Sequence, residues 1–442
     1  MLFISEQLLK APVLLHPGRY SQRFSTFVIK IIGVKLSEMR YNHFKVNHGE
    51  LGMAQENGGQ SVRDYGNRKK RVKRIRNVII ITLVLIIAVG ASVYLYYLYN
   101  KSYKSFETIS SVDNAAGGAA RYFSYGSAVV KYTKDGATAI NKDGKLIWNG
   151  SYEMNNPVTD TCGDYVVVAD KGGTSVEIFD GKGTAGSISV PYDIIKAEVA
   201  SQGVVAVLME NKNANYIYLY DVDGSGLVEM KTNVPEDGYP LDMSLSNDGK
   251  KLIANYLTVT GGKLASTATF YNFGEVGQNG VDKIVGFNKY EDIVAPRVIF
   301  NNNNTACLFK DNALMIFSYS EKPSVIAEEN FESKIRSIFY SDSYVGVVLE
   351  QGAQGYNQLI VYRLDGRKVL DKKLDYDFTN IYMSGEEIIM NDNTSCVVLK
   401  LNGSVKFSQT FDSNIAAIYP INQLDKYFLI NEDKISQISL VE

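Results

Sequence analysis

Residues 134–148, which have the sequence KDGATAINKDGKLIW, contain the pattern that decides the fold. Two Asp-Gly pairs, Asp135-Gly136 and Asp143-Gly144, stand on either side of a short run of residues. An Asp-Gly pair tolerates the positive φ angles of a type I′ turn, whose twist suits the right-handed twist of a β-hairpin. A strand with such a turn at each end predicts a series of antiparallel hairpins.

The same sequence pattern of short strands and tight turns continues from about residue 120 to the end of the chain. Short runs rich in β-branched and aromatic residues are separated by Gly, Asn and Asp, and no helical periodicity is sustained. Further turn pairs occur at Asp180-Gly181, Asp223-Gly224, Asp248-Gly249, Asp365-Gly366 and Asn402-Gly403. These features predict an all-β domain.

The hairpins recur as a unit. The segments that resemble an opening strand begin near Ala119, Pro157, Ile194, Pro240, Val294, Lys334, Thr379 and Asn414. Their mean spacing is about 42 residues, which is the period of a four-stranded propeller blade. We therefore predict a β-propeller over residues 121–442 with eight blades. Seven blades are the alternative count, because the fourth unit is unusually long and the first opening strand is weak. A β-sandwich or two stacked domains is the competing fold, but neither needs a steady period.

The last unit is short by about one strand and its turn. It begins at Asn414 and has only 29 residues. The segment Phe106–Val112, within a linker over residues 100–120, can supply the missing strand and close the ring. Closure hides sheet edges that would otherwise pair with other chains.

A single apolar segment precedes the propeller. Val78 to Tyr99 is a run of 22 residues without a charge. At about 1.5 Å per helical residue it spans roughly 33 Å, which is enough to cross a hydrocarbon core of about 30 Å. We predict one transmembrane helix in contact with the lipid bilayer. A cleaved signal peptide is the alternative, but the run exceeds a typical signal-peptide core, which favours a retained anchor.

Basic residues stand before this segment and few follow it. The preceding cluster consists of Arg68, Lys69, Lys70, Arg71, Lys73, Arg74 and Arg76. The positive-inside rule therefore predicts a cytoplasmic stub over residues 1–77 and an extracytoplasmic propeller at the cell membrane. Two interpretations stay open for residues 1–52. Either translation of the native protein begins at Met53, or the segment is a genuine extension.

Charge and residue usage exclude several classes of function. Residues 1–100 hold 15 Lys+Arg and 5 Asp+Glu, whereas the remainder holds 31 and 43. An acidic propeller argues against nucleic-acid binding, which needs clustered positive charge. All three histidines precede Met53, so the propeller lacks the imidazole of Ser-His-Asp and Cys-His catalysis. Cys162, Cys307 and Cys396 lie beside or within apolar runs, and we expect buried structural thiols.

One segment resembles a metal-binding loop. Asp221 and Asp223, followed by Glu229, place carboxylates at short intervals, as calcium requires. The match to a complete loop fails, because a third oxygen ligand and a Glu at the twelfth position are missing. We therefore expect a hairpin turn, with these three residues as weak metal candidates. No cofactor and no catalytic residue is assigned.

Several segments resemble known propeller repeats. Residues 134–148 resemble a quinoprotein-type blade, and Ser246–Leu252 resembles the Ser-x-Asp-Gly-Lys strand pair of WD40-like and TolB-like propellers. The whole arrangement over residues 60–442 resembles an uncharacterised family of membrane-anchored propellers from Gram-positive bacteria. Such resemblances imply the fold and specify function weakly. A quinone-dependent dehydrogenase is disfavoured, because those enzymes repeat a docking Trp and Trp148 is the only Trp in this chain.

These features favour a non-catalytic binding or scaffold module of the cell envelope, with a protein or a cell-wall component as partner. The long fourth unit, with loops expected over residues 258–268 and 272–283, is the most promising place for a specialised surface. A lactonase-like or glycan-cleaving hydrolase with carboxylates in the central channel is the alternative. A sensor that signals through the stub is a third hypothesis, weakened by the shortness of that stub.

Overall fold

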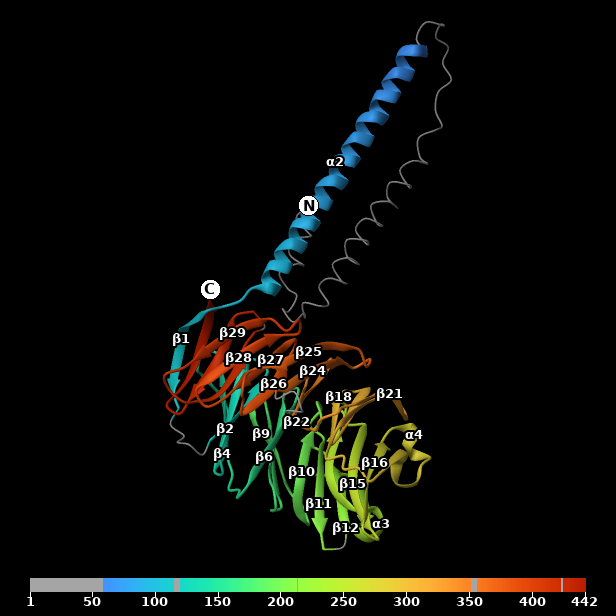
Figure 1. The fold of residues 1–442 in the computed structure, drawn as a ribbon, viewed down its shortest axis with the longest axis vertical. Helices are drawn as coiled ribbons and strands as arrows, with labels where there is room; N and C mark the ends of the chain where they lie inside the picture. The colour runs from blue at the N-terminus through green and yellow to red at the C-terminus, as the bar shows by residue number, and fades with distance from the viewer. Residues whose placement is uncertain (1–58, 115–119, 213, 351–355, 423) are drawn as a thin grey trace. The chain divides into compact units, whose positions relative to one another are not determined.

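The computed structural model describes residues 59–114, 120–212, 214–350, 356–422 and 424–442 (Figure 1). The chain divides into two compact units, Met1–Tyr99 and Asn100–Glu442. The segment before Met53, with its two interpretations, lies outside the described residues. Residues 115–119, within the expected linker, lie outside them as well.

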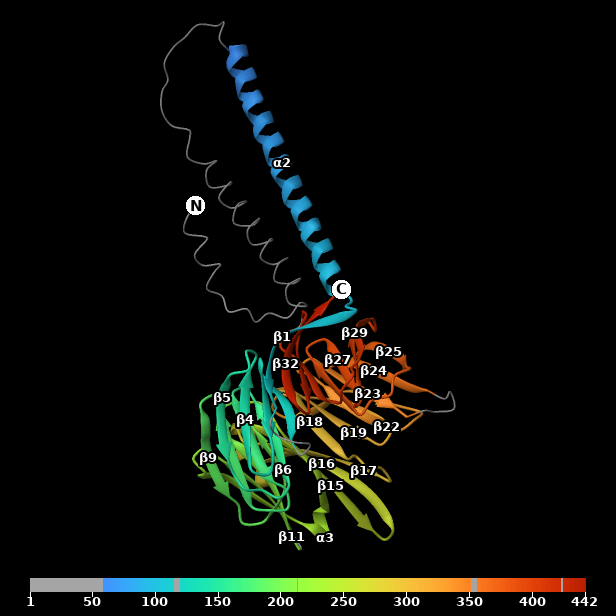
Figure 2. The ribbon, with the colours of Figure 1, turned by 90° about the vertical axis from the view of Figure 1, so that its left-hand side faces the viewer.

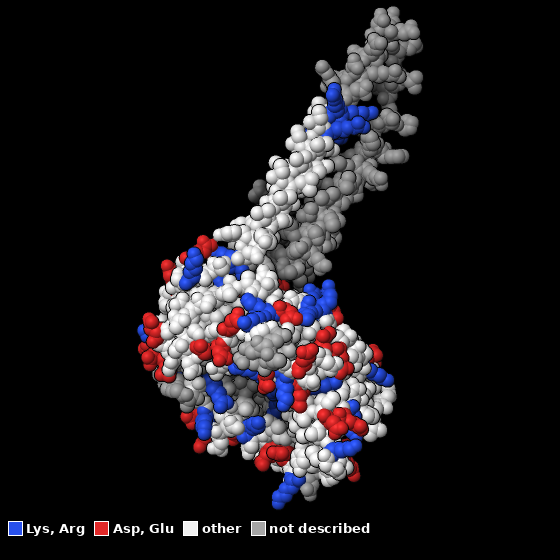
Figure 3. All heavy atoms as spheres, viewed as in Figure 1, with Lys and Arg blue, Asp and Glu red and all other residues white. Residues whose placement is uncertain are grey.

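The first described element is the helix α2, Gly59–Asn100. It contains the basic cluster and the apolar run in one continuous helix. Its segment Lys69–Tyr97 contains a run that is long and apolar enough to cross a membrane. Figure 3 shows the basic side chains as a blue group on this helix, followed by an uncharged surface. The helix begins before the predicted span Val78–Tyr99, because Lys and Arg are themselves good helix formers.

The described residues from 105 onward form eight four-stranded antiparallel sheets, numbered here in chain order. This confirms the all-β propeller with eight blades, and the alternative count of seven is wrong. Sheet 1 consists of β2 (Arg121–Tyr125), β3 (Ala128–Tyr132), β4 (Gly136–Asn141) and β5 (Leu146–Ser151). Sheet 2 consists of β6 (Pro157–Cys162), β7 (Tyr165–Asp170), β8 (Ser175–Asp180) and β9 (Gly183–Ser189). Sheet 3 consists of β10 (Asp193–Val199), β11 (Val205–Asn211), β12 (Ala214–Tyr220) and β13 (Gly226–Asn233).

Sheet 4 follows the short helix α3 (Val234–Asp237). It consists of β14 (Tyr239–Leu245), β15 (Lys251–Thr260), β16 (Lys263–Asn272) and β17 (Ile284–Glu291), with α4 (Glu275–Gln278) and η2 (Val281–Lys283) before β17. Sheet 5 consists of β18 (Arg297–Asn302), β19 (Thr305–Lys310), β20 (Ala313–Tyr319) and β21 (Pro323–Asn330). Sheet 6 consists of β22 (Ile335–Tyr340), β23 (Tyr344–Leu349), β24 (Asn357–Arg363) and β25 (Lys368–Leu374).

Sheet 7 consists of β26 (Asn380–Ser384), β27 (Glu387–Asn391), β28 (Ser395–Lys400) and β29 (Val405–Thr410). Sheet 8 consists of β30 (Ile415–Pro420), β31 (Lys426–Asn431), β32 (Lys434–Val441) and β1 (Ser105–Asp113). In each sheet the opening strand begins within three residues of the position that the repeat predicted.

The opening strands lie side by side from one sheet to the next. β6 contacts β10, β14 contacts β18, β22 contacts β26, and β30 of the last sheet contacts β2 of the first. The opening strand is therefore the inner strand of each blade, and the last strand of the blade is the outer one. We refer to the eight opening strands as the inner strands.

The ring closes through β1, which completes sheet 8 by pairing antiparallel with β32 (Figure 2). Their register runs from Ser105 opposite Val441 to Asp113 opposite Lys434. Just before β1, the amide of Tyr103 donates to the Lys406 carbonyl at 2.8 Å. The chain therefore becomes part of the propeller within a few residues of the end of α2.

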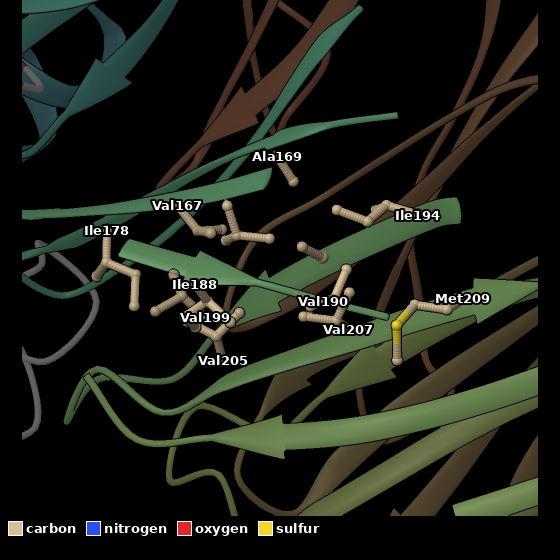
Figure 4. Close-up of a cluster of buried hydrophobic side chains, with 12 residues drawn as sticks. Val167, Ala169, Ile178, Ile188, Val190, Ile194, Val199, Val205, Val207 and Met209 are labelled. Atoms are coloured by element: carbon tan, nitrogen blue, oxygen red, sulfur yellow. The ribbon is translucent and has the colours of Figure 1, made fainter. Parts of the chain in front are cut away.

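Apolar clusters between neighbouring sheets form the core. Between sheets 2 and 3, Val167 and Ala169 of β7 lie opposite Val205 and Val207 of β11 (Figure 4). All four side chains are fully buried. Because each blade is covered on both faces, its second strand is buried along most of its length, as in β7 and β11. Third strands such as β4 and β12 instead alternate between buried and half-buried residues.

A buried ion pair joins the last two blades. Lys406 of β29 contacts the carboxylate of Glu387 on β27, and the Tyr427 hydroxyl of β31 donates to the same carboxylate at 2.5 Å. Burial raises the pKa of Glu387, and Lys406 only partly offsets this. A charge pair with a third hydrogen-bonding partner satisfies the geometric requirement for burying ions.

Candidate binding site

Charged and polar side chains gather on five successive inner strands, β6, β10, β14, β18 and β22. We call this group the inner-strand ion cluster, and it consists of Asp160, Lys196, Glu198, Asp242, Arg297 and Tyr340. The strands belong to sheets 2 to 6, so the cluster covers one arc of the ring. It is the part of the molecule that decides between a channel enzyme and a binding ring.

Lys196 lies at the centre of this cluster. Its ammonium nitrogen is 2.7 Å from a carboxylate oxygen of Glu198 and 2.7 Å from one of Asp242. Burial alone would lower the pKa of Lys196, but the two carboxylates outweigh that effect and raise it. Lys196 is therefore a permanent cation, and Arg297 adds a second positive charge 3.7 Å from Asp242.

Each acidic side chain of the cluster accepts a backbone hydrogen bond from the inner strand of the next sheet. The Val199 amide donates to Asp160 at 2.9 Å, the Leu245 amide to Glu198 at 2.6 Å and the Val298 amide to Asp242 at 3.1 Å. Ser244 repeats the arrangement, since its hydroxyl accepts from the Phe300 amide at 2.9 Å. We call these bonds the inter-blade bonds, because they satisfy buried backbone donors across the boundaries between sheets 2, 3, 4 and 5.

Asp160 differs from its neighbours in its protonation. Burial raises the pKa of this carboxyl group to about 7, and the charge of Glu198 adds to the effect. The Val199 amide and Lys196 act in the opposite direction but do not cancel it. Asp160 therefore changes its charge near neutral pH.

A second region stands out in sheet 4. Its two middle strands, β15 and β16, have 10 residues each, whereas the middle strands of the other sheets have five to eight. They meet at Gly261-Gly262, where both glycines have positive φ angles of 59° and 78°. The expectation of a long loop over residues 258–268 is therefore wrong, because this segment extends a hairpin. Residues 272–283 do form a connection, which contains α4 and η2.

The longer hairpin forms one wall of a cavity of about 280 Å³. β13 and α3, which end the preceding sheet, form the opposite wall. Five threonines line this cavity, and we call it the threonine cavity. They are Thr232, Thr258, Thr260, Thr267 and Thr269.

Strand register explains why the threonines lie together. Tyr256 stands opposite Thr267 in the β15–β16 pair, and Thr258 and Thr260 follow on the same side of β15 because side chains alternate. The opposite end of this face packs into an apolar cluster with sheet 3, which includes Leu252 and Met230. One face of sheet 4 is thus apolar where sheet 3 covers it and rich in hydroxyl groups beyond that point.

Two tyrosines separate the apolar end from the threonine cavity. The hydroxyl oxygens of Tyr256 and Tyr271 are 3.3 Å apart, and both side chains are buried and line the cavity. Burial raises the pKa of Tyr256 to about 12, and it raises that of Tyr271 as well. Both residues are therefore neutral hydroxyl groups over the physiological pH range.

The α3 segment carries the acidic wall of the cavity. Glu236 and Asp237 line it, and one oxygen of Asp237 accepts a hydrogen bond from the Asn233 amide at 2.8 Å. On the other side of α3, a second cavity of about 420 Å³ is lined in part by Tyr192 and Tyr239. We call it the tyrosine cavity. Val234 of α3 contributes to its wall, so this four-residue segment separates two cavities.

The residues singled out as metal candidates lie in the hairpin between β12 and β13. Asp221 and Asp223 accept backbone hydrogen bonds from Val222 and Ser225, and Gly224 takes a positive φ of 83°. Glu229 lies further along β13, opposite Tyr218. These bonds form the expected hairpin turn. Within the described residues, no group of three or more His, Cys, Asp and Glu side chains could hold a metal ion.

The cysteines are free thiols. Cys307 and Cys396 are buried as expected, whereas Cys162 is half-buried at the end of β6. Burial raises the pKa of the Cys162 thiol to about 11, so it stays protonated at neutral pH. A protonated thiol is a weak nucleophile, which agrees with a structural role.

Comparison with known proteins places residues 99–440 in a family model described as a family of unknown function, DUF5711. No curated protein matches the chain. Similar solved structures include BamB from Moraxella catarrhalis, at 11% identity and a TM-score of 0.45, with 76% of this chain and 100% of that chain covered. Saccharomyces cerevisiae Sqt1 is similar at 13% identity and a TM-score of 0.48, with 78% and 100% covered. The Neurospora crassa Pan2 WD40 domain is similar at 10% identity and a TM-score of 0.39, with 65% and 90% covered.

Proposed function

Because this chain belongs to the DUF5711 family, whose function is unknown, we propose a function from its own geometry. The protein is a membrane-anchored, extracytoplasmic β-propeller that serves as a non-catalytic binding or scaffold module of the cell envelope. Its partner is an envelope protein or a component of the cell wall.

The helix α2 supports the anchoring and its direction. Its apolar segment is exposed along nearly its whole length, and the basic cluster lies at its N-terminal end. The positive-inside rule then assigns the propeller to the outer side of the membrane.

Labelling of introduced cysteines tests this topology. Lys322→Cys places a thiol on the exposed turn between β20 and β21, and Lys70→Cys places one in the basic cluster. A membrane-impermeant maleimide should label Lys322→Cys in intact cells, and Lys70→Cys only after permeabilisation. The native cysteines serve as the background in the unchanged chain. The reverse pattern would overturn the proposed topology.

The contrast between the inner-strand ion cluster and the two cavities supports a binding function rather than a catalytic one. The carboxylates of the inner-strand ion cluster are bonded to Lys196 and to backbone amides, so they are already used in joining blades. The threonine and tyrosine cavities, by contrast, offer polar groups toward open space where sheet 3 meets sheet 4. Concave sites with convergent polar groups are the usual places for ligands.

Site-specific photo-cross-linking tests for a partner. A photoreactive amino acid replaces Tyr239, which is 59% exposed and lines the tyrosine cavity, in the full-length protein in living cells. Val369, 37% exposed on the outer strand β25, is the control position. We expect a cross-linked envelope component from position 239 and none from position 369. Equal products at both positions, or none at either, would contradict a binding role for this surface.

A propeller hydrolase is a second candidate, and the protonation of Asp160 favours it. A carboxyl group with a pKa of about 7 beside a second carboxylate is an arrangement that glycan-cleaving enzymes use for acid catalysis. If this candidate is right, the purified protein cleaves lactones or glycans, and Asp160→Asn and Glu198→Gln abolish cleavage while the fold is kept. Cleavage that survives both substitutions would exclude it.

A further inference from the structure

We propose that the threonine cavity is a saccharide-binding site that holds one sugar residue, with the tyrosine cavity across α3 holding an adjoining residue of the same glycan. This inference deepens the proposed binding function and rests on it. It assigns the chemical class of the ligand and the groups that contact it.

The chemistry of the threonine cavity matches that of a sugar. A threonine hydroxyl both donates and accepts, and so does each hydroxyl of a saccharide. The Thr258 hydroxyl already donates to the Ala265 carbonyl at 3.2 Å, which leaves its lone pairs for a ligand donor. The Asp237 carboxylate accepts from Asn233 through Oδ2 and has further acceptor capacity for a sugar hydroxyl.

The same lining disfavours other small ligands. An apolar ligand would desolvate the threonine hydroxyls without replacing their hydrogen bonds, which costs free energy. An anion would meet the carboxylates of Glu236 and Asp237, with Lys289 as the single basic side chain in the lining. A neutral ligand with many hydroxyl groups has neither penalty. A small cation remains as an alternative, and the experiment below includes it.

Size and placement indicate a chain of sugars. The threonine cavity, at about 280 Å³, lies at the lower limit of roughly 300 Å³ for sites that take drug-sized ligands. It therefore suits a single ring rather than a whole oligosaccharide. The tyrosine cavity begins on the other side of α3, only a few residues away.

The tyrosine cavity complements the first with aromatic surface. Tyr239 is 59% exposed, and Tyr192 stacks on Tyr216 with ring centroids 4.2 Å apart. An aromatic face packs against the C–H face of a sugar ring, while Glu210 in the same lining supplies hydrogen-bond acceptors. A glycan that passes over α3 would thus meet hydroxyl groups in one cavity and aromatic rings in the other.

Direct binding of defined tetrasaccharides to the full-length protein in detergent tests the proposal. The probes are chitotetraose, cellotetraose and maltotetraose, and saturation-transfer NMR and calorimetry measure binding. We expect at least one of them to bind. Thr258→Val combined with Thr267→Val keeps the β-branched shape and removes two hydroxyls, so it should weaken that binding about tenfold. Thr138→Val, on β4 of sheet 1 and outside both cavities, is the matched control and should leave the affinity unchanged.

Three results would overturn the proposal. The first is no binding of any of the three tetrasaccharides at concentrations up to about 10 mM. The second is an affinity that the double substitution leaves unchanged, with the melting temperature also unchanged. The third is binding of spermidine that excludes the sugars and is lost in Asp237→Asn, which would assign a cation site. In each case the photo-cross-linking at position 239 is read separately, so the broader binding function can stand when the saccharide assignment fails.

Discussion

The inner-strand ion cluster and the threonine cavity are both rich in polar side chains, yet they use them in opposite ways. On the inner strands, Asp160, Glu198 and Asp242 each accept a backbone amide of the next sheet, and Lys196 neutralises two of them. In the cavity, the threonine hydroxyls line open space between β13 and the β15–β16 hairpin.

This difference shows how a closed ring can separate the polar side chains that join its blades from those that can bind a ligand. A ring of blades must satisfy the backbone donors at each inter-blade boundary, and side-chain acceptors on the inner strands do this. A strand pair that extends beyond its neighbour is free of that requirement. Its side chains are then available to bind a ligand. The 10-residue strands of sheet 4 form such a strand pair.

Removing the cation from the inner-strand ion cluster should have the largest effect. Lys196→Met leaves Glu198 without its ion-pair partner and leaves Asp242 with Arg297 alone. Loss of one partner of such a buried pair costs about 3 kcal/mol of unfolding free energy. Chemical denaturation measures this. Lys368→Met is the matched control, because its pair with Asp371 is exposed and should change stability by less than about 1 kcal/mol. Equal small losses for both would contradict a structural role for the cluster.

The protonation of Asp160 should produce the next largest effect, through pH. Its pKa is about 7 in the folded state against 3.8 ordinarily, so the folded state favours the protonated form. The stability that this group contributes is therefore fully present below about pH 4 and is lost as the pH rises through 7.

Asp160→Asn keeps an acceptor for the Val199 amide and removes the titration. Between pH 5 and pH 8 the unchanged protein should lose stability relative to this variant by on the order of 2 kcal/mol. Thermal melting across the pH range measures the difference. Parallel stability curves for the two proteins would show that Asp160 does not titrate in this range.

An inter-blade bond without charge should matter less. Ser244→Ala leaves the buried amide of Phe300 without its acceptor, and an unsatisfied buried donor costs about 1 kcal/mol or somewhat more. Ser187→Ala, an exposed serine on β9 that bonds to Glu177, is the control and should be nearly neutral. A control that costs as much as Ser244→Ala would remove the distinction between inter-blade bonds and surface bonds.

The turn between β12 and β13 should give the smallest effect. Asp223→Ala removes the acceptor for the Ser225 amide and should lower the melting temperature slightly, whereas Asp223→Asn keeps an acceptor and should lower it less. Calcium at about 1 mM should leave the melting temperature of the unchanged protein where it was. A clear rise with calcium, lost in Asp223→Ala, would restore the calcium interpretation of Asp221, Asp223 and Glu229.

The sequence was sufficient for the ring because propeller blades are made from local signals. Turn pairs and β-rich runs set the opening strands, and β6 begins at Pro157, the residue that the repeat predicted. The shortness of the last unit indicated that a strand from elsewhere must complete it, and β1 occupies that place.

The inner-strand ion cluster could not be predicted in the same way. Asp160 and the Val199 amide come from different sheets, and only the ring brings them together. A signal exists in retrospect, because Asp160, Glu198 and Ser244 occupy equivalent positions of successive opening strands. The loop expected over residues 258–268 rests on the length of the fourth unit alone, whereas the alternation of Thr258, Val259 and Thr260 is typical of a strand.

The most direct test of the account measures unfolding free energy and tetrasaccharide affinity together on two variants of the full-length protein. We predict that Lys196→Met lowers stability and leaves the affinity of the folded protein unchanged, whereas Thr258→Val with Thr267→Val lowers affinity about tenfold and leaves stability within about 0.5 kcal/mol. If both variants lower both quantities, or if the threonine variant affects stability alone, the separation of structural and binding polar groups is contradicted.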